Sequence, residues 1–270
     1  MTQNPYVPDA HSPREIARLV ENAGVAKART DALTLGVLAV LAGAFISLGA
    51  LFFTVVVTGS PAGFGLTRLA GGLSFSLGLI LVVVAGAELF TGNNLLAMAW
   101  ASRLIATREV LRNWAIVYAG NVLGCLGTVL FVVWGGIDGL AGGAVGETAV
   151  RIAQAKAGLG FGEAFARGIL CNALVCLAVW LTLGGRSVAD RIAAIVFPIT
   201  AFVAMGFEHS IANWFFLPYG LVLGGQASVS LAGSALNLFS VTLGNMAGGT
   251  LLVAGVYWVA YLRGDNGFKE

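Results

Sequence analysis

Long apolar segments with few charged residues limit what this sequence can fold into. Six such segments cover about residues 33–58, 69–100, 113–135, 162–184, 192–223 and 238–262. A helix needs roughly 20 apolar residues to cross a bilayer. Of the 270 residues, 58% are hydrophobic and only 10% are charged, whereas a soluble domain carries about 25% charged residues. A single soluble core cannot hide so much apolar surface. We therefore expect an all-α membrane protein with six transmembrane helices.

Two of the six segments are too long for one simple crossing, and both contain polar residues halfway. The polar residues are Glu88, Thr91, Asn93 and Asn94 in the second segment, and Glu208, His209, Ser210 and Asn213 in the fifth. A helix broken at membrane depth tolerates such groups when the break is buried in protein or borders water. The second and fifth helices are therefore predicted to be broken. Glu88 is expected to cap the half-helix after its break; for Glu208 we consider both a capping role and a role in a pore.

The two interrupted segments resemble each other. "GAELFTGN" and "GFEHSIAN" share the pattern Gly-x-Glu-x4-Asn, 120 residues apart, and "GNVLG" and "GNMAG" follow them, 124 residues apart. Each half, about 33–135 and 162–262, contains three crossings. Because three is an odd number, the halves would enter the membrane in opposite senses, as an inverted repeat whose breaks meet near the midplane. The alternative is a pair of kinks that only relieve packing.

The positions of lysine and arginine predict the orientation. Six crossings put both termini on one side, and cytoplasmic loops are enriched in these residues. One side holds Arg14, Arg18, Lys27, Arg29, Arg103, Arg108, Arg112, Arg186, Arg191, Arg263 and Lys269, and the other holds Arg68, Arg151, Lys156 and Arg167. Both termini are therefore expected in the cytoplasm. The chain would then consist of a cytoplasmic segment 1–32, a membrane domain 33–262 and a short cytoplasmic tail 263–270.

Two smaller features complete the organisation of the chain. Residues 14–29 have apolar residues at helical spacing and are expected to form an interfacial helix or a short solvated one. The net charge of +2 and the lack of a basic cluster give no reason to expect nucleic acid as a partner.

Four motifs, "FSLGLILVVVAGAELFTGN", "CNALVCLAVW", "GFEHSIAN" and "VTLGNMAGG", together resemble the formate/nitrite transporter family. The resemblance covers nearly the whole chain and implies an aquaporin-like fold of three plus three helices. It also implies an inner-membrane homopentamer, surrounded by lipid, with one pore per protomer. The expected substrate is a small monovalent anion. The motifs are most similar to the formate-channel branch, and a nitrite or hydrosulfide channel is the alternative within the family.

The resemblance also implies roles for particular residues. His209 corresponds to the single pore histidine, Thr91 to its hydrogen-bonding neighbour and Asn245 to another polar residue near it. The expected apolar pore residues are Phe75 and Phe202 at a periplasmic constriction, with Leu79, Leu89 and Phe90 along the lining. A polar cluster at the periplasmic mouth is expected from Lys156, Asn172, Glu208 and Asn213.

A pore for anions has to reduce the cost of moving charge through hydrocarbon. It can supply positive potential, or it can give the anion a proton so that the neutral acid crosses. Lys156 would supply positive potential at the mouth. His209 is the only histidine in the apolar segments, and histidine changes charge most easily near neutral pH. Both proton transfer and a simple pause at a cation remain open at this point.

Two other classes of protein are less consistent with the sequence. A water or neutral-solute channel of the aquaporin type would carry paired Asn-Pro-Ala motifs, and none occurs. A membrane enzyme or electron-transfer subunit would need paired axial ligands or a nucleophile with its base. Neither pattern is evident, so we expect no enzymatic activity, no cofactor and no metal.

Overall fold

The computed structural model describes residues 10–264, and helices dominate this part of the chain. The helices, in chain order, are α1 (Pro13–Arg29), α2 (Ala32–Val57), α3 (Gly63–Val84), η1 (Gly92–Leu95), α4 (Leu96–Ala101), α5 (Thr107–Trp134), η2 (Ile137–Gly143), α6 (Ala144–Ala157), α7 (Phe161–Gly184), α8 (Val188–Ala204), α9 (Ser210–Ser228), α10 (Leu231–Ala247), η3 (Gly248–Gly255) and α11 (Val256–Tyr261). The described part contains no strand. Most of the expected tail, residues 265–270, and residues 1–9 of the N-terminal segment lie outside the described residues.

Five helices of the described part are long and apolar enough to cross a membrane. They are α2, α3, α5, α7 and the continuous stretch Leu231–Tyr261 formed by α10, η3 and α11. Only 39 to 44% of the residues in their most apolar windows are buried within the chain. Lipid or other protein must cover the rest. The expected fifth segment, 192–223, is divided between α8 and α9, which is why it does not count among the five.

The two expected breaks follow the same local pattern. After α3, Gly86 adopts a φ of +82°, and after α8, Gly206 adopts a φ of +76°. Left-handed backbone of this kind is readily open only to glycine. In each case a short non-helical segment follows, ending before η1 at Thr91 and before α9 at His209. The chain therefore interrupts its helices at the two places where the sequence carries its buried polar residues.

Glycines let neighbouring helices approach closely in both halves. A Cβ added to Gly124 of α5 would lie 2.1 Å from the carbonyl oxygen of Val40 in α2. A Cβ added to Gly244 of α10 would lie 2.3 Å from the carbonyl oxygen of Phe165 in α7. The glycines of the two "GNxxG" motifs thus do what small residues do in membrane helix packing.

Helix α1 packs against the rest of the protein. It begins with a capping box in which Ser12 and Glu15 exchange hydrogen bonds. Its apolar face buries Ile16, Ala17 and Val20 in a cluster with residues of α4 and α7. The expected helix is therefore present, and its apolar face contacts protein.

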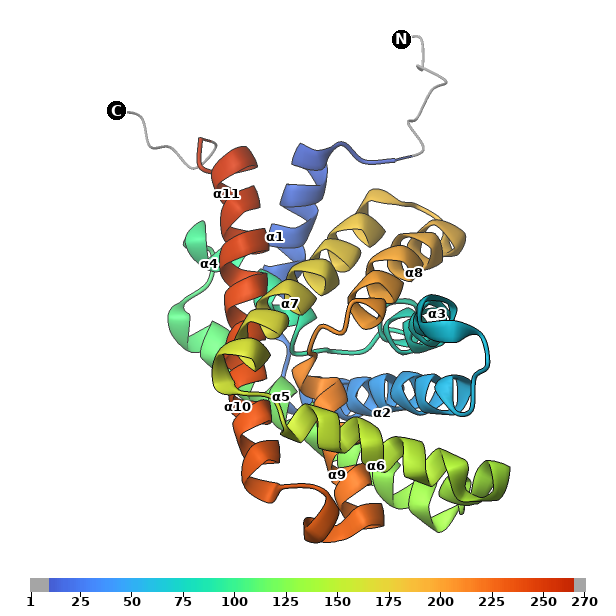
Figure 1. The fold of residues 1–270 in the computed structure, drawn as a ribbon. Helices are drawn as coiled ribbons and strands as arrows, with labels where there is room; N and C mark the ends of the chain where they lie inside the picture. The colour runs from blue at the N-terminus through green and yellow to red at the C-terminus, as the bar shows by residue number, and fades with distance from the viewer. Residues whose placement is uncertain (1–9, 265–270) are drawn as a thin grey trace.

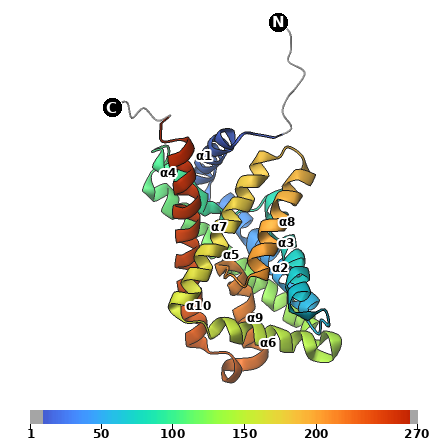
Figure 2. The same cartoon turned by 45° about the horizontal axis from the view of Figure 1, so that its top comes forward.

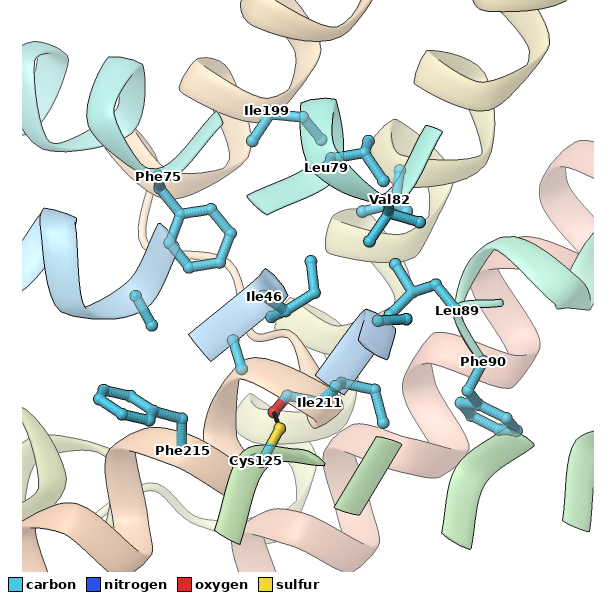
Figure 3. Close-up of a cluster of buried hydrophobic side chains, with 14 of the residues drawn as sticks. Ile46, Phe75, Leu79, Val82, Leu89, Phe90, Cys125, Ile199, Ile211 and Phe215 are labelled. Carbon is cyan, nitrogen blue, oxygen red and sulfur yellow. Dashed lines mark hydrogen bonds between the residues drawn. The ribbon is translucent and has the colours of Figure 1, made fainter. Parts of the chain in front are cut away.

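Helices α1 and α6 lie at opposite ends of the molecule (Figures 1 and 2), and we call these the α1 end and the α6 end. Helix α11 lies at the α1 end beside α1, and the connection between α9 and α10 lies near α6. The main apolar core lies between these ends. Figure 3 shows side chains from α3, from the segment after it and from α9 converging in this core.

Candidate functional site

His209 is a buried histidine at the start of α9, and both of its ring nitrogens have partners. Nδ1 accepts a hydrogen bond from the backbone N–H of Ala212 at 3.1 Å and so caps α9. Nε2 lies 3.1 Å from Oγ1 of Thr91. Because a backbone N–H can only donate, Nδ1 is unprotonated in this arrangement and Nε2 carries the ring proton. The two interrupted segments, 118 residues apart, thus meet at this hydrogen bond.

A cavity of about 210 Å³ leads from the α6 end to His209. The rings of Phe75 and Phe202 border it, edge to face, with centroids 5.6 Å apart. The Phe202 ring stacks against His209 with centroids 6.1 Å apart. Both phenylalanines therefore line the cavity that reaches the imidazole, and their role as a constriction stays a prediction.

A second cavity, of about 370 Å³, lies on the α1 side of the same interrupted segments. Leu79, Val82 and Leu89 border it and lie near one another in the core (Figure 3). The expected lining residues Leu79 and Leu89 therefore do line a cavity. Phe90 borders neither cavity; its ring packs against Tyr118 of α5 at 4.9 Å instead. The ring thus contacts α5, and the expected place of Phe90 along the pore lining stays a prediction.

Lys156, Glu208 and Asn213 form one hydrogen-bonded cluster at the α6 end. Lys156 donates to both carboxylate oxygens of Glu208, at 2.9 and 3.1 Å. Asn213 donates to Glu208 at 2.7 Å and to the side-chain oxygen of Asn237 at 2.7 Å. Asn237 in turn donates to the backbone carbonyl of Lys156 at 2.9 Å. The side chains of Lys156 and Glu208 are only 15% and 6% exposed, so this is a largely desolvated ion pair.

Asn172 lies elsewhere than expected. Its amide donates to the backbone carbonyls of Thr91, at 3.2 Å, and Asn245, at 2.7 Å. It therefore supports the segment that carries Thr91, and Asn237 holds the fourth place in the Lys156 cluster. The sequence did not indicate Asn237, because this residue of α10 lies outside the four motifs that resemble the family.

The α1 end carries a second cluster of the same design, which sequence reasoning missed. Lys27 of α1 donates to both oxygens of Glu88, at 2.8 and 2.9 Å. Asn93 donates to Glu88 at 2.7 Å and to Asn113 at 3.0 Å, and Asn113 donates to the backbone carbonyl of Lys27 at 3.1 Å. Each bond has its counterpart in the Lys156 cluster. The internal repeat was the signal that could have found it, since Glu88 and Asn93 occupy the positions of Glu208 and Asn213.

Neither glutamate caps a helix. His209 caps α9, and Glu88 and Glu208 bind lysine and asparagine side chains. The expected capping role of Glu88 is therefore wrong. A lysine ammonium carries a full positive charge and forms an ion pair with the carboxylate, which a neutral backbone N–H cannot do.

Asn245 fixes the backbone on both sides of His209. Its oxygen accepts from the N–H of Ser210 at 2.8 Å, and its amide donates to the carbonyl of Glu208 at 3.0 Å and to that of Gly168 at 2.8 Å. The expected position near the histidine is therefore present. Because these bonds use the whole side chain, Asn245 positions the imidazole and offers no free donor to a ligand.

Comparisons with known proteins agree with this geometry. A family model described as "Formate/nitrite transporter" matches residues 14–259. The chain is 42% identical to "Formate channel FocA" of Escherichia coli strain K12, over 97% of this chain and 98% of that protein. It is 41% identical to "Uncharacterized transporter YrhG" of Bacillus subtilis, over 96% of each chain.

Solved structures give the same result. A structure described as "Pentameric formate channel with formate bound" is similar with a TM-score of 0.79 and 40% identity, over 86% of this chain and 98% of that one. An "FNT family ion channel" is similar with a TM-score of 0.84 and 28% identity, over 91% and 98% of the two chains. The relatives with an assigned activity are channels and transporters by name, and none is an enzyme. This chain is a membrane protein that belongs to the formate/nitrite transporter family.

Proposed function

We propose that this protein is a channel for small monovalent anions and that its substrate is formate. The observation that carries the proposal is the His209–Thr91 pair, which lies between one cavity open toward α6 and another on the α1 side. Support for formate in particular comes from two of the similar proteins, which are described as formate channels. The resemblance seen in the sequence points to the same substrate.

An anion entering from the α6 end would first meet positive charge. Lys156 and the two arginines Arg68 and Arg167 border that cavity. Past Phe75 and Phe202, it would reach the imidazole and the N-terminus of α9, which favours negative charge. Since Nδ1 is occupied by the N–H of Ala212, Nε2–H is the one ring donor, and it would have to turn from Thr91 to the anion. Movement of a proton together with the anion would require a further proton donor. A change of internal pH during uptake would reveal such a proton.

We further propose six membrane crossings arranged as an inverted repeat. The second crossing would combine α3 with η1 and α4, and the fifth would combine α8 with α9. The matching hydrogen bonds around Glu88 and Glu208 support this arrangement, as do the two left-handed glycines. Residues 33–262 would then form the channel domain.

The same arrangement would place both termini on the cytoplasmic side of the inner membrane. Helices α1 and α11 lie at one end of the molecule. The cavity at that end is bordered by Lys27 and Arg191 of the cationic side, and the α6 cavity by Lys156 and Arg167 of the other. This separation agrees with the division of charges seen in the sequence.

We also propose a homopentamer in lipid. Support comes from the similar structure named as a pentameric channel. Large apolar side chains on α5, such as Leu130, Phe131 and Trp134, are 66 to 81% exposed in the single chain. A neighbouring copy or lipid would have to cover them.

The test of function is anion uptake into proteoliposomes, with formate, nitrite, hydrosulfide, acetate and lactate compared at two pH values. Internal pH is recorded in the same experiment to detect a proton that moves with the anion. His209→Asn keeps a side chain suited to capping α9 but removes Nε2–H. We expect this variant to lose at least about tenfold of the formate flux, as for a charge-assisted bond. Thr91→Val should lower the flux by about fivefold, as for a neutral hydrogen bond.

Thr128→Val is the matched control, because Thr128 donates to the carbonyl of Gly124 within its own helix and borders neither cavity. Its formate flux should equal that of the wild type. Formate uptake by His209→Asn at the wild-type rate and pH dependence would overturn the proposed role of His209. A wild type that moves nitrite or hydrosulfide but not formate would overturn the substrate assignment alone.

A further inference from the structure

Two arginine side chains converge at the outer part of the α6-end cavity, beyond the Phe75–Phe202 pair. Arg68 comes from α3 and Arg167 from α7, and both border the cavity. A Cβ built on Gly206 would lie 3.3 Å from a terminal nitrogen of Arg68 and 4.0 Å from one of Arg167. Both guanidinium groups therefore lie beside the same glycine.

Backbone carbonyls hold Arg68 in place without neutralising it. Its Nε donates to the carbonyl of Ala204 at 3.0 Å and Nη2 to that of Val203 at 2.6 Å, both at the end of α8. Among the described residues, no carboxylate lies within ion-pair distance of Arg68. A guanidinium has five N–H donors. Three N–H donors of Arg68 therefore take no part in these two bonds. The side chain keeps its positive charge, and the two carbonyls fix its position.

The other charges near the cavity are already paired. Lys156 binds Glu208, and Arg167 binds Glu163 of its own helix and also donates to the carbonyl of Gly206 at 3.4 Å. Glu208 is the carboxylate that borders the cavity. The positive charge that no carboxylate of the cavity balances therefore lies where Arg68 and Arg167 border the cavity. An anion at this place would meet planar guanidinium groups, whose N–H donors match the geometry of a carboxylate.

We propose that Arg68 and Arg167 form an outer binding station for a single carboxylate, through which an anion passes before the Phe75–Phe202 pair and His209. This station rests on the proposed function. It adds to that function a named binding site at the α6 end of the channel. A carboxylate held by the pair is dehydrated in part before the apolar constriction, which lowers the barrier to entry from the α6 end. The chemical class is a small monocarboxylate, recognised through its two oxygens.

The experiment measures formate binding and formate transport on the same variants. Binding of ¹³C-formate to the full-length protein in detergent is followed by NMR titration, and uptake is measured with formate presented from the α6 side of oriented proteoliposomes. Arg68→Gln and Arg167→Gln remove one guanidinium each. Arg151→Gln is the matched control, because Arg151 lies at the same end, is 62% exposed, and pairs with Glu147 away from this cavity.

We expect Arg68→Gln and Arg167→Gln each to raise the half-saturating formate concentration by about tenfold, as for loss of a charge-assisted bond. The maximal uptake rate should stay within about twofold, because His209 and the constriction are unchanged. Arg68→Lys keeps the positive charge but loses the pair of parallel N–H donors that a guanidinium offers to a carboxylate. Its half-saturating formate concentration should therefore lie between those of Arg68→Gln and the wild type. Arg151→Gln should match the wild type in both measurements.

Arg68 also holds the end of α8, so elution as an intact oligomer is checked for every variant. If Arg68→Gln does not fold, Arg167→Gln decides the question, because the only side-chain bond from Arg167 to the interrupted segment is the long one to Gly206 and the backbone bond from Glu208 is unchanged. Half-saturation in Arg167→Gln equal to that in Arg151→Gln would overturn the station. A wild type that binds formate through the two arginines but does not transport it would overturn the proposed function and leave the station standing.

Discussion

Asn121 and Asn245 make the same set of hydrogen bonds in the two halves of the chain. Asn121 accepts from the N–H of Phe90 at 2.9 Å, and donates to the carbonyls of Glu88 at 2.9 Å and Ala39 at 2.7 Å. Asn245 does the same for Ser210, Glu208 and Gly168. Each asparagine thus ties an interrupted segment to a neighbouring helix.

Replacing either asparagine should destabilise the protein. Asn121→Ala leaves the backbone N–H of Phe90 and the carbonyl of Glu88 without these partners. Asn245→Ala does the same to the N–H of Ser210 and the carbonyl of Glu208. Each buried group that stays unsatisfied costs about 1 to 3 kcal/mol. We expect both variants to unfold at clearly lower temperature in detergent, measured by thermal unfolding of the purified protein. Gln154→Ala, at an exposed position of α6, is the control. Unfolding of Asn121→Ala at the wild-type temperature would show that its network contributes nothing.

Phe202 is expected to control the size of the anion that passes. Its ring lies between Phe75 and His209, in contact with both. Phe202→Leu shortens the side chain at this point and should admit one more methyl group. We expect acetate uptake relative to formate to rise by roughly tenfold, the scale on which an apolar site discriminates one methylene.

The control for Phe202→Leu is Phe239→Leu, since Phe239 is 60% exposed on α10 and far from this contact. Proteoliposome uptake of the two acids gives the ratio directly. An unchanged ratio in Phe202→Leu would mean that selection by size occurs elsewhere.

The capping box of α1 should make this helix sensitive to acid. The backbone N–H of Ser12, followed by its side chain, lowers the pKa of Glu15, and His11 and Arg186 lower it further. A lowered pKa in the folded state means that the charged carboxylate stabilises α1 above the ordinary value of 4.5. This contribution is lost as the pH falls through the lowered pKa.

A spin label attached in an Asn22→Cys variant, at an exposed position of α1, reports this change. We expect the label to become more mobile as the pH is lowered below the ordinary value of 4.5 and through the lowered pKa of Glu15. In a second variant that also carries Glu15→Gln, this step should be missing. The same step in both variants would assign the acid sensitivity to a group other than Glu15.

The polar residues Glu88 and Glu208, in apolar surroundings that a straight helix exposed to lipid would not allow, lie between α3 and η1 and between α8 and α9. Of the four residues that the resemblance grouped, Lys156, Glu208 and Asn213 are hydrogen-bonded together, and their place at a pore mouth stays a prediction. It did not predict that Asn172 bonds to Thr91 and Asn245, since a hydrogen bond between residues 81 positions apart leaves no local signal.

Helix α6 was missed for a different reason. With Glu147, Arg151 and Lys156 in 14 residues it is too polar and too short to resemble a crossing, so hydropathy does not indicate it. Helix α1 carries the lysine of the other cluster, as α6 does at its end. The sequence predicted this helix but not the ion pair between Lys27 and Glu88. Both lysines belong to helices outside the apolar segments. Hydropathy identifies only the apolar segments, so it could not predict the contacts of these lysines with Glu88 and Glu208.

The two lysine clusters should differ in how much stability they contribute. Removing one partner from a buried ion pair costs about 3 to 5 kcal/mol, because the other charge stays buried and unpaired, whereas an exposed pair contributes about 1 kcal/mol or less. The Lys156 and Glu208 side chains are 15% and 6% exposed, and those of Lys27 and Glu88 are 35% and 13% exposed. We therefore expect Lys156→Met to lower the thermal stability more than Lys27→Met does.

The matched double variant separates lost charge pairing from lost packing. In Lys156→Met with Glu208→Gln, no unpaired charge remains, so most of the lost stability should return, measured by thermal unfolding in detergent. Lys27→Met with Glu88→Gln should regain less, because water already reaches that pair. If Lys156→Met is as stable as Lys27→Met, then Glu208 must reach water or take up a proton when it loses its lysine, and burial is not what distinguishes the two ends of this channel.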